Sequence, residues 1–100
     1  MQIKMLFSLL ELYKTKNISR ASDILFLTQQ GLSRQIKALE EELGVTLFIR
    51  KKDGVIPTEI CDQLIPHFQS MCQSYTEALN MIEWKTGLGL RIGLSYGLSN

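Results

Sequence analysis

The sequence has few of the residues that mark a membrane protein, a disulfide scaffold or a metalloprotein. It contains two cysteines, one histidine and one tryptophan, and no apolar run approaches the roughly 18 residues of a membrane helix. Cys61 and Cys72 would lie roughly 16 Å apart along one helix, beyond the reach of a disulfide. His67 has no cysteine or histidine pair nearby for a zinc site. We therefore expect reduced thiols in a cytoplasmic protein, with no metal and no cofactor in this segment.

An excess of charge of one sign is also missing. The 100 residues include 11 basic and 10 acidic side chains, with a net charge of +1 and a pI near 7.8. With 45% hydrophobic residues, the chain is too apolar for a disordered tail. It also lacks the strongly basic composition, with a pI above about 9, that is typical of nucleic-acid binders.

Apolar residues at helical spacing predict three helices in the first 44 residues. The first covers about residues 2–15. Ser19 is expected to cap a short second helix, and Thr28 is expected to cap the third. Gly44 is expected to end the third helix. One apolar stripe runs along this third helix, formed by Leu32, Ile36, Leu39 and Leu43.

A β-hairpin and a long helix are predicted next. Two short apolar runs around Asp53-Gly54 predict the hairpin, with three consecutive cations at its tip. After Thr58, apolar residues recur every three to four positions, which predicts a long helix that pairs with another helix. Pro66 predicts a bend near residues 62–66. The residues expected to form the dimerisation seam are Leu64, Phe68, Met71, Tyr75, Leu79 and Ile82.

The polar face of the third helix carries the functional prediction. Gln30, Ser33, Arg34 and Lys37 lie opposite the apolar stripe, and Gln29 precedes them. Gln can bond the adenine edge and Arg the guanine edge in the major groove, and a helix N-terminus favours phosphate. The glutamates 40–42 lie at the far end, so the helix would enter N-terminus first. Beside it, phosphates would be held by the hairpin cations Arg50, Lys51 and Lys52.

Two other functions compete with DNA binding. The third helix and the hairpin are also compatible with a protein-interaction module whose long helix only oligomerises. An enzyme fragment lacks support, because the sequence shows no nucleophile–base pair, metal cluster or glycine-rich phosphate loop. Lys14, Lys16 and Arg20 are either solvated charges or phosphate contacts. The short second helix, the tight turn and the basic hairpin together favour a winged helix-turn-helix that binds double-stranded DNA.

A family resemblance supports this interpretation. Leu32-Ser33-Arg34-Gln35-Ile36, followed by Leu39-Glu40, Leu43-Gly44, Leu47-Phe48 and Arg50, resembles the signature of the LysR-type transcriptional regulators. The resemblance runs from about residue 3 to residue 92. It places the DNA contacts on Thr28, Gln29, Gln30, Ser33 and Arg34, and the wing contact near Arg50–Asp53. The sequence departs from the family at Gln30-Gly31, where Pro-Ala is usual.

The resemblance also implies how the chain is organised. Residues 1–58 would form the winged helix-turn-helix domain, and residues 59–86 a linker helix that pairs antiparallel in a homodimer, with a tetramer expected at full length. Residues 87–100 would form a hinge and the first strand of a missing domain that binds a small-molecule effector. Residues 1–52 hold 9 basic and 5 acidic groups, whereas residues 53–100 hold 2 and 5. The near-neutral total is thus the average of a cationic DNA-facing half and an anionic dimerising half.

Overall fold

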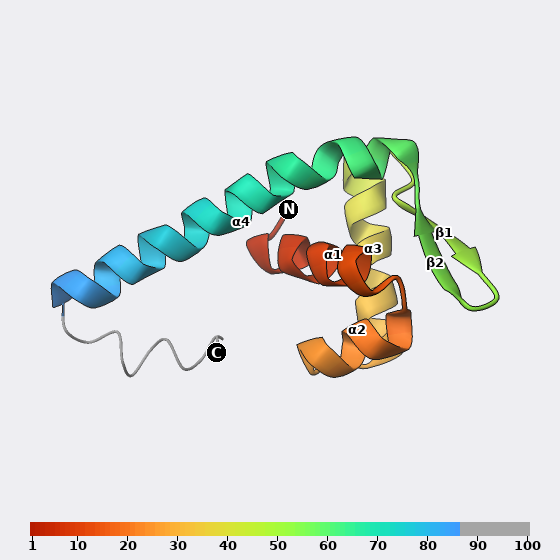
Figure 1. Ribbon diagram of the computed structural model, residues 1–100, viewed down its shortest axis with the longest axis horizontal. Coiled ribbons are helices and arrows are strands. Elements are labelled where there is room, and N and C mark those ends of the chain that lie inside the picture. The colour runs from red at the N-terminus through yellow and green to blue at the C-terminus, as the bar shows by residue number, and fades with distance from the viewer. Residues whose placement is uncertain (87–100) are drawn as a thin grey trace. The chain divides into compact units, whose positions relative to one another are not determined.

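The computed structural model describes residues 1–86, with side chains to residue 82. It is mainly helical, and the predicted order of three helices, a hairpin and a long helix is confirmed (Figure 1). The predicted strand after residue 87 lies outside the described residues. The chain divides into two compact units, Met1–Gln69 and Ser70–Asn100. The elements are α1 (Ile3–Thr15), α2 (Ile18–Leu25), α3 (Gln29–Leu43), β1 (Phe48–Lys51), β2 (Gly54–Pro57) and α4 (Glu59–Thr86).

The start of α2 corrects one prediction. The Asn17 side-chain oxygen accepts a hydrogen bond of 2.9 Å from the backbone N–H of Arg20, so Asn17 caps the helix. The expected cap, Ser19, lies inside α2 instead. Asn and Ser are about equally good N-caps, and the earlier of the two candidates adds two residues to a helix of only 8 residues.

Both ends of α3 are as predicted. The Thr28 hydroxyl accepts a hydrogen bond of 2.9 Å from the backbone N–H of Gly31, which satisfies one of the unpaired donors of the first turn. Gly44 ends the helix with a φ of 74°, and its N–H donates to the Glu40 carbonyl at 2.8 Å. This left-handed conformation is the one that glycine adopts with least strain.

The core of the first unit lies between α1, α2 and α3, which pack against one another in pairs. One hydrogen bond joins α1 to α3 at the edge of this core. The hydroxyl of the buried Ser8 donates to the side-chain oxygen of the half-buried Gln35 at 2.7 Å. The Tyr13 hydroxyl donates at 2.8 Å to Asp62 of α4, and this bond and the adjacent negative charge raise the pKa of Tyr13. The fully buried leucines are Leu6, Leu9, Leu12, Leu32, Leu39 and Leu47.

The hairpin is attached to the segment between α1 and α2. β1 and β2 pair antiparallel, with Arg50 opposite Val55 and Lys51 opposite Gly54. The N–H of Val55 donates to the Lys16 carbonyl at 3.1 Å. A Cβ at Gly54 would collide with that same carbonyl oxygen, and Gly54 has a φ of 154°. Gly54 is therefore required by both its conformation and its close approach to Lys16.

α4 forms one continuous helix through Pro66. Its first turn is stabilised by Thr58, whose hydroxyl accepts from the N–H of Cys61 at 3.3 Å. Pro66 is exposed, so water can bond the carbonyl that its missing N–H leaves without a helical partner. Cys61 and Ile65 are buried on the opposite side of these turns.

Candidate nucleic-acid interface

The exposed face of α3 carries most of the predicted DNA-contacting residues. Leu32, Ile36 and Leu39 are buried, and this fixes the rotation of the helix. The side chains predicted to read DNA therefore lie on the outer surface. Those exposed are Thr28, Gln29, Gln30, Arg34 and Lys37, and Ser33 is half-buried.

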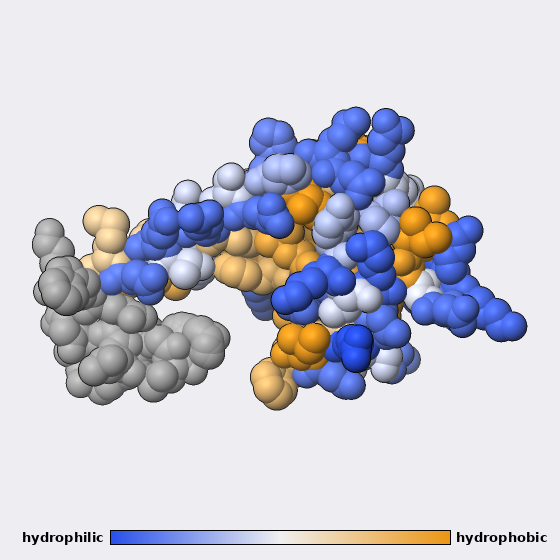
Figure 2. Space-filling view, in the orientation of Figure 1, coloured by the Kyte–Doolittle hydropathy of each residue, from blue (hydrophilic) through white to orange (hydrophobic). Residues whose placement is uncertain are grey.

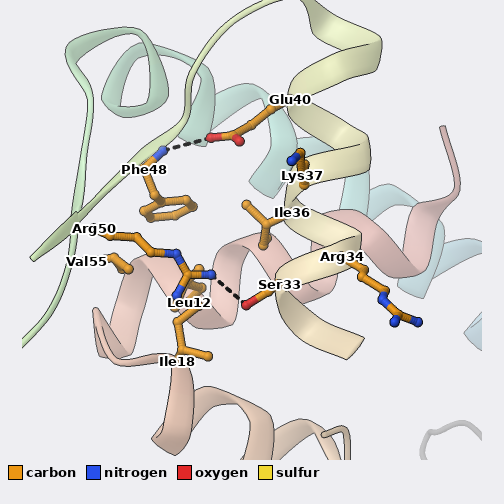
Figure 3. Close-up of a pocket in the computed structure, with 10 residues that line it drawn as sticks. All are labelled: Leu12, Ile18, Ser33, Arg34, Ile36, Lys37, Glu40, Phe48, Arg50 and Val55. Atoms are coloured by element: carbon orange, nitrogen blue, oxygen red, sulfur yellow. Dashed lines mark hydrogen bonds between the residues drawn. The ribbon is translucent and has the colours of Figure 1, made fainter. Parts of the chain in front are cut away.

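Ser33 connects this face to the hairpin. The Arg50 guanidinium donates a hydrogen bond of 2.7 Å from Nη2 to the Ser33 hydroxyl oxygen. Figure 3 shows the Arg50 side chain reaching from β1 toward α3, whereas Arg34 extends away from the hairpin. Because Ser33 accepts this bond, its own hydroxyl hydrogen is still available for a ligand. The arrangement places two guanidinium groups near one helix face, one of them positioned before any ligand binds.

A pocket of about 400 Å³ lies where α3 and the hairpin meet. Its inner wall is apolar and its rim is polar, with Arg50 and Ser33 bonded at its edge (Figure 3). Cationic groups around an apolar wall attract an anionic sugar–phosphate backbone and repel a free cation. Its lining residues are Leu12, Ile18, Ser33, Arg34, Ile36, Lys37, Glu40, Phe48, Arg50 and Val55.

Glu40 holds the hairpin in place, a role that sequence reasoning missed. One carboxylate oxygen of Glu40 accepts hydrogen bonds from the backbone N–H groups of Leu47, at 2.7 Å, and Phe48, at 3.2 Å. From the sequence, Glu40 was only one of three glutamates expected to stay away from phosphate. A signal was available in its spacing: a carboxylate seven and eight residues before two apolar residues at the entry to the hairpin can reach their N–H groups once Gly44 reverses the chain.

The three hairpin cations occupy different positions, which corrects the prediction that they share the tip. Arg50 and Lys51 belong to β1, and only Lys52 lies in the turn. Successive strand residues point to opposite faces of the hairpin, so Arg50 faces α3 with the buried Val55, and Lys51 faces away. Lys51 and Lys52 are exposed. The hairpin therefore offers one cation beside α3 and two at its outer end.

The predicted dimerisation residues fall into two groups. In the first turns of α4, Phe68 is only 5% exposed and Leu64 is half-buried. Phe68 is thus already buried in the single chain, and little of its ring is left for a partner. Further along, Met71, Tyr75 and Ile82 are exposed by 43%, 42% and 53%, and Leu79 is half-buried. The apolar surface of α4 lies mainly in this later part.

Two kinds of site find no candidate within residues 1–86. No group of three or more His, Cys, Asp or Glu residues there is arranged to hold a metal ion. In the same part of the chain, no helix is both long and apolar enough to cross a membrane. Cys61 and Cys72 are free thiols, both buried, and burial is the main cause that raises their pKa values.

Three packed helices with a capped, polar third helix and a basic hairpin beside it define a winged helix-turn-helix protein. The family described as "bacterial regulatory helix-turn-helix protein, lysR family" matches residues 3–62 of the chain. The chain belongs to this family.

The chain is similar to a transcriptional regulator and to two proteins of solved structure. The chain is 32% identical over 78 residues to the HTH-type transcriptional regulator HdfR of Salmonella typhimurium, a match that covers 78% of this chain and 28% of HdfR. The chain thus spans little more than a quarter of this relative. Oxidised OxyR of Corynebacterium glutamicum matches 86% of the chain with a TM-score of 0.82 at 27% identity, covering 26% of OxyR. The complex of the BenM DNA-binding domain with catB site 1 DNA matches 83% of this chain and 93% of that domain, with a TM-score of 0.78 at 26% identity.

Proposed function

We propose that the chain is the DNA-binding part of a sequence-specific transcription regulator, and not an enzyme, acting in the cytoplasm. α3 would read base edges in the major groove, and the hairpin would hold the phosphate backbone. The observation that carries this proposal is the shared face of α3 and β1, where Arg34 is exposed and the 2.7 Å bond between Arg50 and Ser33 holds a second guanidinium against α3. The DNA complex of BenM, a similar protein, supports it.

We also propose that the regulator is a homodimer that pairs through the later turns of α4. Met71 and Ile82 expose apolar surface there, in a helix of 28 residues, which is long for a globular protein. A small-molecule effector would bind a part of the protein beyond this segment, and a tetramer would form at full length. These two points rest on the family resemblance.

A salt titration on duplex DNA tests the proposed interface. With Lys37, Arg50 and Lys52 on phosphates in each half of a dimer, log K should fall against log salt with a slope of about −5. Lys37→Ala should reduce the size of that slope by about 2, because two contacts disappear per dimer. Lys4→Ala removes another exposed lysine, from α1, and serves as the matched control.

The test also separates reading from holding. Arg34→Ala should cost about 1–3 kcal/mol on a selected duplex and much less on random DNA, because a base contact is lost. Absence of binding at low salt would contradict the proposal. So would equal effects of Lys37→Ala and Lys4→Ala.

A further inference from the structure

Two residues other than glycine adopt the left-handed conformation within the described residues. Lys16 has a φ of 56° and follows α1, and Phe26 has a φ of 58° and follows α2. An L-residue in this conformation is strained, and a bulky one more so than glycine or asparagine. Each residue therefore needs an explanation.

Lys16 is explained by contacts inside the fold. Its carbonyl accepts the hydrogen bond from Val55 that attaches the hairpin. Its ammonium group donates to the Tyr13 carbonyl at 2.8 Å and lies 4.6 Å from the centre of the Tyr13 ring. The left-handed turn at Lys16 thus places both ends of the residue in favourable contacts.

The backbone at Phe26 has a similar local explanation, but its side chain does not. The N–H of Phe26 donates to Asp23 at 3.2 Å and that of Leu27 to Ser22 at 2.9 Å, the two bonds of a Schellman motif. Glycine usually occupies the left-handed position of this motif. Here the position holds an aromatic ring that is 94% exposed. The ring gains almost no burial in the chain to offset the strain.

The position of Phe26 brings its ring to the proposed DNA surface. Phe26 lies two positions before Thr28, the cap of α3, a span of at most about 7 Å. A major groove is about 12 Å wide, so a ring this close to the leading end of a helix in the groove lies among base edges or against the groove wall. Figure 2 shows apolar side chains at the surface where α2 ends, within a mostly hydrophilic face.

We propose that Phe26 is a base-contacting residue, and that its ring packs on the 5-methyl group of a thymine beside the entry point of α3. The thymine methyl is the apolar group that the major groove displays, and it is the natural partner for an uncharged ring among amides and cations. Contact with this methyl would bury the ring that the free chain leaves exposed. The inference rests on the proposed function, and the experiment below lets the two fail separately.

The variant that tests the proposal is Phe26→Asn in the full 100-residue chain. Asparagine tolerates the left-handed conformation, so Tm should rise by about 4 °C. Affinity should nevertheless fall about tenfold on a duplex that the wild-type chain selects from a random pool. A residue with only a structural role cannot give this opposite pair of effects. Ile24→Ala, which trims an exposed apolar residue in the last turn of α2, is the matched control and should leave affinity unchanged.

Replacing individual thymines of the selected duplex by uracil identifies the contact. Uracil at the contacted position should weaken wild-type binding about fourfold, the effect of one buried methyl group, and should not weaken Phe26→Asn binding further. Equal affinity of Phe26→Asn and wild type would overturn the contact. So would a uracil effect that persists in the variant, or a change in oligomeric state seen by sedimentation. If the wild-type chain selects no duplex, the proposed function fails as well.

Discussion

The early and later turns of α4 carry similar apolar residues in opposite environments. Cys61, Ile65 and Phe68 are no more than 5% exposed, whereas Met81 and Ile82 are exposed by 70% and 53%. The early turns continue a core that α1, α2 and α3 build. The later turns belong to the second unit of the chain. One helix thus contributes to the core over its first turns and exposes large apolar side chains near its later end.

This difference shows that the period of apolar residues does not distinguish a core from an interface. The same three-to-four spacing runs from Thr58 to Ile82 and predicts one seam, yet burial changes along it. The same substitution made in the two regions should therefore act on different equilibria. Unfolding should respond in one region, and association in the other.

The largest effect is expected from a matched pair of leucines. Leu39→Ala in α3 should reduce the free energy of unfolding by about 3 kcal/mol, because Leu39 is completely buried and its loss leaves a cavity. Leu79→Ala in α4 should cost well under that at low protein concentration, because Leu79 is only half-buried. Urea denaturation at two protein concentrations measures both. Equal losses for the two variants would remove the distinction between the regions.

A charge in the later part of α4 should act on association. Leu79→Asp should weaken the dimer at least tenfold, since a carboxylate would be buried against an apolar partner helix. Asn80→Asp adds the same charge at a neighbouring exposed position and should leave the dimer intact. Sedimentation equilibrium gives the dissociation constants. A dimer that tolerates Leu79→Asp would show that the exposed surface of α4 is not where the chains pair.

Two glycines sharpen the comparison within the first unit. Gly54→Ala should destabilise by about 2 kcal/mol or more, because the new Cβ meets the Lys16 carbonyl and forces the hairpin away from it. Gly44→Ala should cost about 1 kcal/mol, because its φ of 74° is strained for alanine but no atom lies within 4 Å of the new Cβ. Thermal unfolding of the two variants separates collision from strain. The same loss for both would mean that Lys16 gives way easily.

Much of this fold could be predicted because local signals agreed with it. Thr28 and Gly44 bound α3 in the sequence as in the structure, and the apolar stripe of α3 identifies its outer face. The prediction that Ser19 caps α2 was wrong because Asn17, two residues earlier, is an equally good cap. Where two residues are equally good caps, capping propensity does not determine where the helix begins. The position of the preceding turn in the fold determines it.

The contacts between distant segments could not be predicted in the same way. The bond from Arg50 to Ser33 joins residues 17 positions apart. The bonds from Leu47 and Phe48 to Glu40 span 7 and 8 positions. All of them depend on how the hairpin folds back on α3. The left-handed Phe26 left no signal either, because a phenylalanine in a turn-forming position reads as a core residue. Sequence periodicity reports faces of single elements, and these features arise where elements meet.

The smallest predicted effect concerns Cys61, which marks the buried end of α4. Burial raises the pKa of this thiol to about 11, the Asp62 and Glu40 carboxylates add to the rise, and Lys16 opposes it. The unfolded chain, with a thiol pKa near 8.5–9, then loses its proton before the folded chain does. Below about pH 8.5 both states keep the proton, and the thiol does not reduce stability. As pH rises toward 11, ionisation favours the unfolded chain, and the free energy of unfolding is lower by about 1 kcal/mol at pH 10. Cys61→Ala should therefore have a shallower loss of stability between pH 8.5 and 11 than wild type, whatever its stability at pH 7. Cys72 is also buried and burial also raises its pKa, so Cys72→Ala should change the slope in the same direction. Urea titrations across this range would contradict the burial argument if the wild-type and Cys61→Ala slopes were the same.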